Sequence, residues 1–135
     1  MIGNSDAHGK NFSFFVHRSG LQAAPWYDLV SVAQYPQFSP ELAMAIGDEF
    51  KLDQVKAFAL ADFARRCGID RHLLLREAKR LRDGVRKHAQ GLAESGPYLD
   101  DERAFVGAIA QYAIAQAERL CDSAAQAVTM PDDIL

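Results

Sequence analysis

The sequence predicts a mainly α-helical domain with one β-hairpin near its N-terminus. From Asp53 onward, apolar residues recur every three or four positions through three long segments, which is the period of amphipathic helices. Before that point, Phe12, Phe14 and Val16 alternate with their neighbours, which indicates a strand. The length of 135 residues fits a single domain with a substantial core.

The first eleven residues form a polar loop that cannot build a core. Gly3 and Gly9 allow backbone angles that other residues avoid, and polar side chains on such a loop commonly point at one ligand. A loop of this composition is also typical of an ordinary turn. Its polar side chains are those of Asn4, Asp6, His8, Lys10 and Asn11.

The hairpin is predicted as a strand over Phe12–Val16, a turn over His17–Gly20 and a return strand over Leu21–Tyr27. Pro25 has no N–H and belongs at the edge or just outside the ladder. Trp26 and Tyr27 precede Asp28 directly. We expect them to be core aromatics that pack the hairpin onto the helices; the alternative is that Tyr27 fixes the rotamer of Asp28.

The segment after the hairpin is predicted to be irregular. It reads as a short helical turn over Leu29–Ala33, a loop over Gln34–Pro40, a strand or a helix over Glu41–Ile46, and a turn at Gly47 and Asp48.

Three helices are then predicted from apolar periodicity and end signals. The first begins near Asp53, its N-cap, and runs to Cys67, where Gly68 stops it. The second is capped by Asp70 and runs to about Leu92. The third runs from Asp100 or Asp101 to Val128. Gly96 and Pro97 break the chain between the last two helices. Acidic residues at the start of the third helix complement the helix dipole.

Basic residues outnumber acidic ones around the second helix. This surface is either a solvated helix face with i,i+4 pairs, such as Asp83 with Lys87, or an electrostatic surface for an acidic partner or DNA. The basic residues are Arg65, Arg66, Arg71, Arg76, Lys79, Arg80, Arg82, Arg86 and Lys87.

The composition excludes several classes of protein. A hydrophobic content of 49% and a charged content of 24% are ordinary for a globular domain. The net charge of −3 gives no global indication of nucleic acid or of an anionic membrane as partner. No apolar run is long enough for a membrane span, and no signal peptide is visible, so we expect a cytoplasmic protein. Cys67 and Cys121 have no metal-site spacing and are predicted to be buried or half-buried thiols.

The order of polar residues in the first 28 positions matches a known catalytic pattern. Asp6 and Asn11 are five positions apart, and Asp28 follows the predicted hairpin. In the catalytic loop of protein kinases, an Asp accepts the proton of the attacking hydroxyl and an Asn five residues later holds Mg²⁺. A second kinase Asp, beyond a hairpin, binds metal at the nucleotide phosphates.

Three segments carry a family resemblance. Gly3–Ser13, Pro25–Asp28 and Leu42–Gly47 resemble the HipA family, bacterial serine/threonine kinases that act as toxins of type II toxin–antitoxin systems. The motifs cover roughly the first third of the chain, and the remainder fits a helical lobe. Where eukaryotic kinases carry a Lys two residues after the loop Asp, this chain has His8, and its Lys is Lys10.

The resemblance implies roles for five residues. Asp6 is the catalytic base, and Asn11 and Asp28 are the metal and cofactor ligands, with ATP and Mg²⁺ as cofactors of the complete kinase. His8 organises the loop. Lys10 either reaches the transferring phosphate or pairs with Asp6, and these two roles stay open.

The resemblance also implies a domain organisation. Residues 1–135 would be a C-terminal kinase lobe, with the catalytic loop and metal-binding hairpin in 1–28 and a helical bundle in 53–128. Only five residues precede Asp6 and no glycine-rich phosphate loop is present, so we expect the N-terminal nucleotide-binding lobe to be absent and the chain alone to be inactive.

The implied partners are a HipB-like DNA-binding antitoxin, a separate N-terminal kinase lobe, and a protein substrate such as an aminoacyl-tRNA synthetase. Neither a membrane nor direct DNA contact is implied. Two alternative functions remain: a non-catalytic module that binds an antitoxin or lobe partner, and a metal-dependent hydrolase with Asp6, His8 and Asp28 as ligands.

Overall fold

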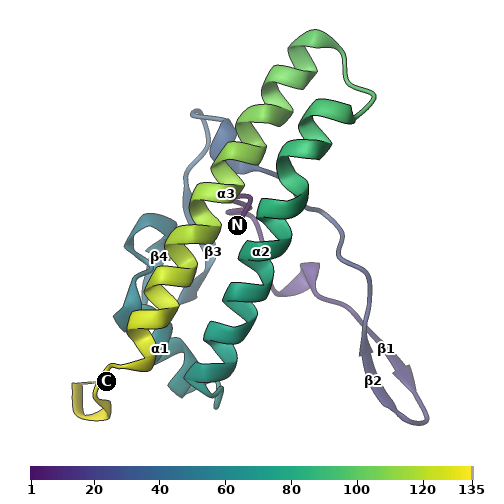
Figure 1. Ribbon diagram of the computed structural model, residues 1–135. Helices are drawn as coiled ribbons and strands as arrows, with labels where there is room; N and C mark the ends of the chain where they lie inside the picture. The colour runs from purple at the N-terminus through teal and green to yellow at the C-terminus, as the bar shows by residue number, and fades with distance from the viewer. Residues whose placement is uncertain (135) are drawn as a thin grey trace.

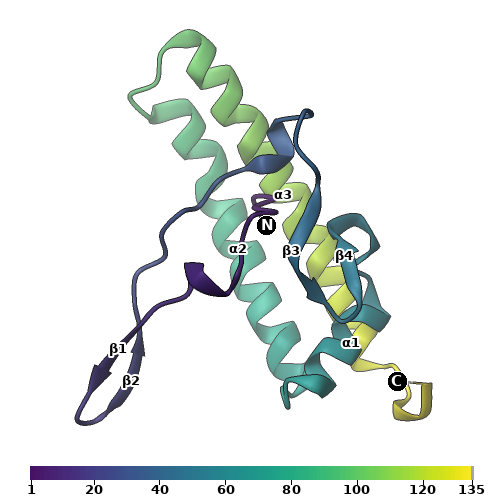
Figure 2. The same ribbon diagram turned by 180° about the vertical axis from the view of Figure 1, so that it is seen from behind.

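The computed structural model describes residues 1–134 and contains three α-helices and two β-hairpins. The helices are α1 (Ala57–Arg66), α2 (Arg71–Ser95) and α3 (Asp100–Val128); the strands are β1 (Phe14–His17), β2 (Gly20–Ala23), β3 (Glu41–Ile46) and β4 (Glu49–Lys51). The long helices α2 and α3 lie side by side, α1 packs near one end of the pair, and β1–β2 extends away from the helices (Figures 1 and 2). The mainly helical prediction is therefore confirmed.

The prediction of a single hairpin is wrong, because β3 and β4 form a second antiparallel pair. The segment over Glu41–Ile46, left open as strand or helix, is a strand, and Gly47 makes the turn with a φ of 63°. The first hairpin is also shorter than predicted. Its ladder runs from the Phe14–Ala23 pair to the His17–Gly20 pair, and Pro25, which cannot donate, lies beyond its end.

The hairpin β1–β2 is not packed onto the helices, which corrects the prediction for its aromatic residues. Trp26 is 70% exposed and Tyr27 is 46% exposed. Trp26 instead contacts Phe12 edge-on, with ring centroids 5.4 Å apart. In both ribbon views the hairpin stands clear of α2 and α3 (Figures 1 and 2), which agrees with the exposure of these side chains.

The start of the first helix differs from its prediction, whereas its end matches. Leu52–Gln54 forms a separate 3₁₀ turn, so Asp53 is no N-cap and α1 begins at Ala57. At the other end Gly68 has a φ of 64° and donates to the Arg65 carbonyl at 3.1 Å, while Ile69 donates to the Ala64 carbonyl at 2.8 Å. This pair of bonds is a Schellman motif, for which glycine is favoured.

The other two helices form where the sequence predicts them. Asp70 caps α2 by accepting a hydrogen bond from the His72 N–H at 2.8 Å, and the helix continues past Leu92 to Ser95. Helix α3 has the predicted bounds. Its buried side chains are mostly alanine, which permits a close approach of α2. Cys121 is buried in this contact, whereas Cys67 is exposed, contrary to its prediction.

An ion-pair network fixes β3–β4 to α1. The carboxylate of Asp62, 4% exposed, accepts from Arg65 at 2.8 Å and pairs with Arg66 Nε at 2.7 Å. Arg66 also forms two 2.8 Å hydrogen bonds to Asp48 in the β3–β4 turn. A Cβ added at Gly47 would lie 2.8 Å from the Ala59 carbonyl, so the turn touches the helix backbone. The network therefore links the β3–β4 turn to α1, while Leu42 and Ile46 of β3 pack against the apolar core; β3 borders the candidate site.

Across residues 1–134, no helix is long and apolar enough to cross a membrane.

The buried carboxylate of Asp62 predicts a pH-dependent contribution to stability. The hydrogen bond from Arg65, opposed by burial and aided by Arg66, holds the Asp62 pKa below its ordinary value of 3.8. A carboxyl with a lowered folded-state pKa stabilises the fold above the unfolded-state pKa, and this contribution is lost as the pH falls through the folded-state value. We expect Asp62→Asn to lower Tm at about pH 7 and the difference from wild type to shrink towards about pH 3.

Thermal unfolding followed by circular dichroism over that pH range measures the effect. The matched control is Asp122→Asn, because Asp122 is also a helical aspartate, in α3, but its side chain is exposed. A Tm difference for Asp62→Asn that is constant over this range would contradict the assignment.

Candidate functional site

Asn11 joins the N-terminal loop to the end of the hairpin. It lies in a 3₁₀ turn over Gly9–Asn11 and is 8% exposed. Its side-chain Oδ1 accepts from the His8 N–H at 2.9 Å, and its Nδ2 donates to Asp28 Oδ2 at 2.8 Å. One buried amide thus closes the loop and orients the carboxylate of Asp28.

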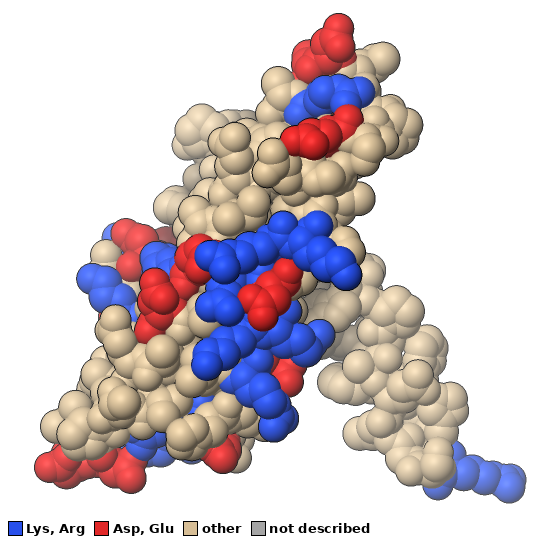
Figure 3. Space-filling view, in the orientation of Figure 1, with Lys and Arg blue, Asp and Glu red and all other residues tan. Residues whose placement is uncertain are grey.

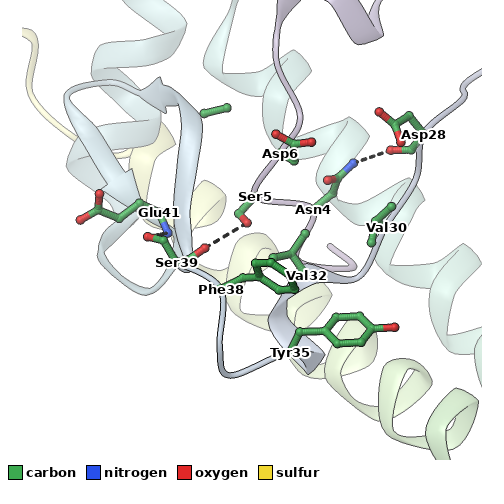
Figure 4. A pocket seen from close by; sticks show the side chains of 11 residues that line it. Asn4, Ser5, Asp6, Asp28, Val30, Val32, Tyr35, Phe38, Ser39 and Glu41 are labelled. Atoms are coloured by element: carbon green, nitrogen blue, oxygen red, sulfur yellow. Dashed lines mark hydrogen bonds between the residues drawn. The ribbon is translucent and has the colours of Figure 1, made fainter.

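Asp28 is held in an unusual backbone conformation. Its φ of 57° is the only positive value at a non-glycine position among the described residues. Asp is one of the few residue types that tolerate this left-handed region. Asn4 Nδ2 donates to the main-chain oxygen of Asp28 at 2.9 Å (Figure 4). Two loop asparagines therefore hold Asp28, Asn4 at the backbone and Asn11 at the carboxylate.

Asn4 was not among the site residues predicted from the sequence. It stands in the quoted motif, but neither its spacing from Asp6 nor its residue type indicated a partner. Only the folded chain shows that its amide reaches a carbonyl 24 positions away.

Asp6 and Asp28 line the same cavity, which has a volume of about 660 Å³. Figure 4 shows both carboxylates on one side of this cavity, with Val32 and Phe38 on the opposite side. Asn11 does not line the cavity but contacts Asp28. The structure therefore brings Asp6, Asn11 and Asp28 into one region of the molecule.

The remaining predicted site residues surround this loop. His8 contributes its main-chain N–H to Asn11, and its ring Nδ1 is buried without a hydrogen-bond partner among residues 1–134. Lys10 is exposed, and none of the ion pairs among the described residues joins it to Asp6. The Tyr27 hydroxyl donates to the Lys10 carbonyl. Tyr27 thus steadies the loop backbone, while Asn11 orients Asp28.

The loop is seated against the segment that follows the hairpin. Ala33 donates to the Gly3 carbonyl at 3.2 Å, and Ala43 of β3 donates to the Ser5 carbonyl at 2.8 Å. Gly3 has a φ of 72°, and a Cβ there would lie 2.6 Å from the Ala33 Cβ. Glycine is therefore required at this position for both its backbone angle and its packing.

The oxygen atoms of Asp28 and Asn11 lie near enough to each other to suit Mg²⁺, but the Asn11 oxygen points away from Asp28. Carboxylate and amide oxygens are the hard ligands that this ion prefers, and it usually keeps waters or substrate oxygens as further ligands. Asp28 and Asn11 are adjacent, but Asn11 presents Nδ2 to Asp28 and uses Oδ1 for His8. Coordination by Asn11 requires its amide to turn over. No group of three His, Cys, Asp or Glu within residues 1–134 could hold a metal ion by itself.

The comparisons with known proteins define the class. The family model for the HipA-like C-terminal domain matches residues 1–91. The chain therefore belongs to the HipA-like C-terminal domain family.

Two relatives and one solved structure show how the chain relates to longer proteins. The chain is 42% identical over 123 residues to the serine/threonine-protein kinase toxin HipA of Shewanella oneidensis, covering 88% of this chain and 28% of the relative. It is 37% identical over 105 residues to Y4mE of Sinorhizobium fredii, named as a candidate kinase, covering 76% of this chain and 25% of the relative.

The solved structure is that of the Shewanella oneidensis MR-1 toxin–antitoxin system, a complex of HipA, HipB and operator DNA. It matches with a TM-score of 0.79 and 39% identity over 96% of this chain and 31% of the matched chain. This chain thus spans about a quarter to a third of the length of these relatives.

The adjacency of Asn11 and Asp28 predicts where a divalent ion binds. Mn²⁺, a paramagnetic substitute for Mg²⁺, is expected to broaden the NMR signals of Asn11 and its neighbours before those of other regions, because these oxygens are closest to the ion. Asp28→Asn should raise the Mn²⁺ concentration needed, and Asp122→Asn should not. Broadening centred instead on the acidic start of α3 (Asp100–Glu102) would contradict this site.

Proposed function

We propose that the chain is the catalytic C-terminal part of a HipA-like kinase that transfers the γ-phosphoryl group of ATP to a Ser or Thr of a protein. The observation that carries this proposal is the 2.8 Å contact between Asn11 and Asp28 beside Asp6. This contact joins Asn11 to Asp28, and Asp28 lines one cavity with Asp6. The three residues follow the kinase order of loop Asp, loop Asn, hairpin and Asp. Family membership supports it, as does the name of the Shewanella relative.

The proposed mechanism relies on positioning and electrostatics. Asp6 accepts the proton of the acceptor hydroxyl, and Asn11 and Asp28 hold Mg²⁺, which neutralises phosphate charge when bound. His8 closes the loop through its main-chain bond to Asn11 Oδ1, and this bond is given up when the amide turns over to hold the ion. Lys10 supplies an exposed positive charge near the transferring phosphate. Nucleotide-cradling groups would come from an N-terminal lobe, so ATP use is proposed for the complete kinase.

The proposed partners follow from the relatives. The solved neighbour is a complex of HipA, HipB and operator DNA. We propose that this chain works beside a HipB-like antitoxin and reaches DNA indirectly through it, with a protein substrate such as an aminoacyl-tRNA synthetase. A cytoplasmic location stays a prediction.

The basic face of α2 leaves its two interpretations open. Lys and Arg side chains cluster on one face of the molecule, with a few acidic side chains among them (Figure 3). Arg80 pairs with Glu77 at 2.7 Å, and Arg86 pairs with Glu118 of α3. Asp83 pairs with Arg82 rather than with the predicted Lys87. Part of this positive charge is thus compensated within the chain.

A binding module is the second candidate function, and one observation favours it. The hairpin leaves a large apolar surface uncovered, with Val16 82% and Leu21 73% exposed. Apolar surface of this kind marks a protein contact. An N-terminal kinase lobe or an antitoxin would cover it without any catalysis by this chain. No comparable observation favours the metal-dependent hydrolase.

A chimeric kinase tests catalysis. The matched segment of the Shewanella HipA is replaced by the corresponding segment of this chain, and phosphoryl transfer from radiolabelled ATP to protein is measured. We expect transfer, and we expect Asp6→Asn to reduce its rate by about 10²–10⁴-fold because the general base is removed. Asp28→Asn should abolish transfer at low Mg²⁺.

The matched control for the chimera is Asp122→Asn, which removes an exposed carboxylate from α3 and should leave the rate unchanged. A folded chimera that transfers phosphate equally well with and without the Asp6 carboxylate would overturn the proposed role. A folded chimera without any transfer would favour the binding module.

The isolated chain should behave differently. Residues 1–135 alone are expected to show no appreciable phosphoryl transfer and only weak nucleotide binding, because in-line transfer depends on a nucleotide held by groups from another lobe. ATP turnover with Mg²⁺ and isothermal titration with ATP measure the two properties. Robust phosphorylation by the isolated chain, lost in Asp6→Asn, would contradict this prediction.

A further inference from the structure

Asp28 lies between the hairpin β1–β2 and a segment that is tied to the beginning of the chain. The hairpin stands clear of the helices (Figures 1 and 2). Three residues beyond Asp28, the hydroxyl of the buried Ser31 donates to the Ile2 carbonyl at 2.6 Å. Asn4 adds a bond that reaches Asp28 itself, because its Nδ2 donates to the Asp28 carbonyl at 2.9 Å. The backbone on both sides of the Asp28 carboxylate is thus referred to the first residues of the N-terminal loop.

Two side chains within residues 1–134 donate hydrogen bonds to Asp28, and they use different atoms of it. Asn11 donates to the carboxylate at 2.8 Å, whereas Asn4 donates to the main-chain oxygen. Coordination of Mg²⁺ needs the carboxylate oxygens and needs the Asn11 amide to turn over, so the bond from Asn11 Nδ2 is given up when an ion binds. The bond from Asn4 leaves both carboxylate oxygens available. Of these two bonds, it is therefore the one that is compatible with a bound ion.

The backbone conformation of Asp28 needs such a bond. Its φ of 57° lies in the left-handed region, which residues other than glycine populate sparsely. A conformation of this kind persists only where the surrounding contacts hold it. Once the bond from Asn4 is removed, the backbone at Asp28 can relax to the more populated conformations with negative φ, and the direction of the carboxylate changes with it.

Asn4 carries a cost in stability that a purely structural role does not explain. Its Oδ1 is buried and has no hydrogen-bond partner among residues 1–134. A buried acceptor without a partner lowers the free energy of unfolding, whereas an apolar side chain of the same shape would leave nothing unpaired. Asn4 also lines the cavity that Asp6 and Asp28 share (Figure 4). An unsatisfied buried group at this place indicates a contribution to function.

We infer that Asn4 is a positioning residue for Asp28: its amide holds the Asp28 backbone in the left-handed conformation, so that the carboxylate faces Asn11 before an ion binds. This inference rests on the metal-binding role proposed for Asp28. When the Asn4 amide is removed, only a fraction of the molecules present Asp28 in the competent conformation, and the apparent metal affinity falls by that fraction. At saturating metal the remaining molecules shift to the competent conformation, so the maximal rate is kept.

Titration of the purified chain with Mn²⁺ tests the inference without any need for catalysis. The measured quantity is the Mn²⁺ concentration that broadens the NMR signal of Asn11 by half. We expect Asn4→Ala to raise this concentration about three- to tenfold, which corresponds to the net contribution of one hydrogen bond. The matched control is Gln37→Ala, which removes an exposed carboxamide from the segment after Asp28, outside the cavity, and should leave the concentration unchanged.

A second variant, Asn4→Leu, separates positioning from folding. Leu has nearly the shape of Asn and leaves no buried acceptor unpaired, so this variant should unfold at a Tm no lower than wild type, as circular dichroism can verify. It should nevertheless raise the Mn²⁺ concentration as Asn4→Ala does. In the chimeric kinase, Asn4→Leu should raise the Mg²⁺ concentration for half-maximal transfer about three- to tenfold and leave the rate at saturating Mg²⁺ unchanged. A side chain that only stabilises the fold would not separate these two quantities.

The outcomes separate this inference from the proposed function. Phosphoryl transfer with the same Mg²⁺ requirement with and without the Asn4 amide would overturn the role of Asn4 and leave the kinase function intact. A lower rate at saturating Mg²⁺ with an unchanged Mg²⁺ requirement would also overturn it. A folded chimera that transfers no phosphate, together with a raised Mn²⁺ requirement in Asn4→Leu, would overturn the kinase function and support Asn4 as the residue that positions Asp28. Raised requirements in both assays, absent from Gln37→Ala, support both.

Discussion

The hydrogen bond between Asn11 and Asp28 is the contact on which the candidate site depends. It joins residues 17 positions apart and brings the end of the hairpin back to the loop that precedes it. Asp28 has a backbone conformation that costs free energy for a non-glycine residue. Asn4 and Asn11 hold that conformation from two directions. These two bonds tie Asp28 to the loop that carries Asp6.

The site is positioned by a series of contacts that begins in the helical core. The buried Asp62 orders Arg66, which fixes the β3–β4 turn through Asp48. Ala43 of strand β3 then donates to the Ser5 carbonyl, and this bond holds the part of the loop that carries Asp6. The N-terminal loop is thus linked to a helix that is remote from it in sequence. Loops that carry function are commonly positioned in this way by a rigid scaffold.

Two apolar surfaces of this chain are at least partly exposed to solvent. One is the hairpin β1–β2, which stands clear of the helices, and the other is the wall of Val32, Tyr35 and Phe38 in the cavity. Isolated apolar residues on a surface need no explanation, but contiguous ones mark contacts with other molecules. The chain covers 28% of the Shewanella HipA, so partner surface from a larger assembly is a consistent explanation for the hairpin.

The sequence by itself determined the features that depend on neighbouring residues. Asp70 and Gly68 mark helix ends whatever the tertiary fold. The motifs in Gly3–Ser13, Pro25–Asp28 and Leu42–Gly47 indicated the family, and the family model confirms it. The tertiary structure decided whatever depends on residues distant along the chain. Three features have no signature in neighbouring residues. They are the pairing of β3 with β4, the exposure of the hairpin aromatics and the hydrogen bond from Asn4 to the main chain of Asp28. They are fixed only by what lies against each segment after folding, because burial and long-range hydrogen bonds are properties of the packed chain.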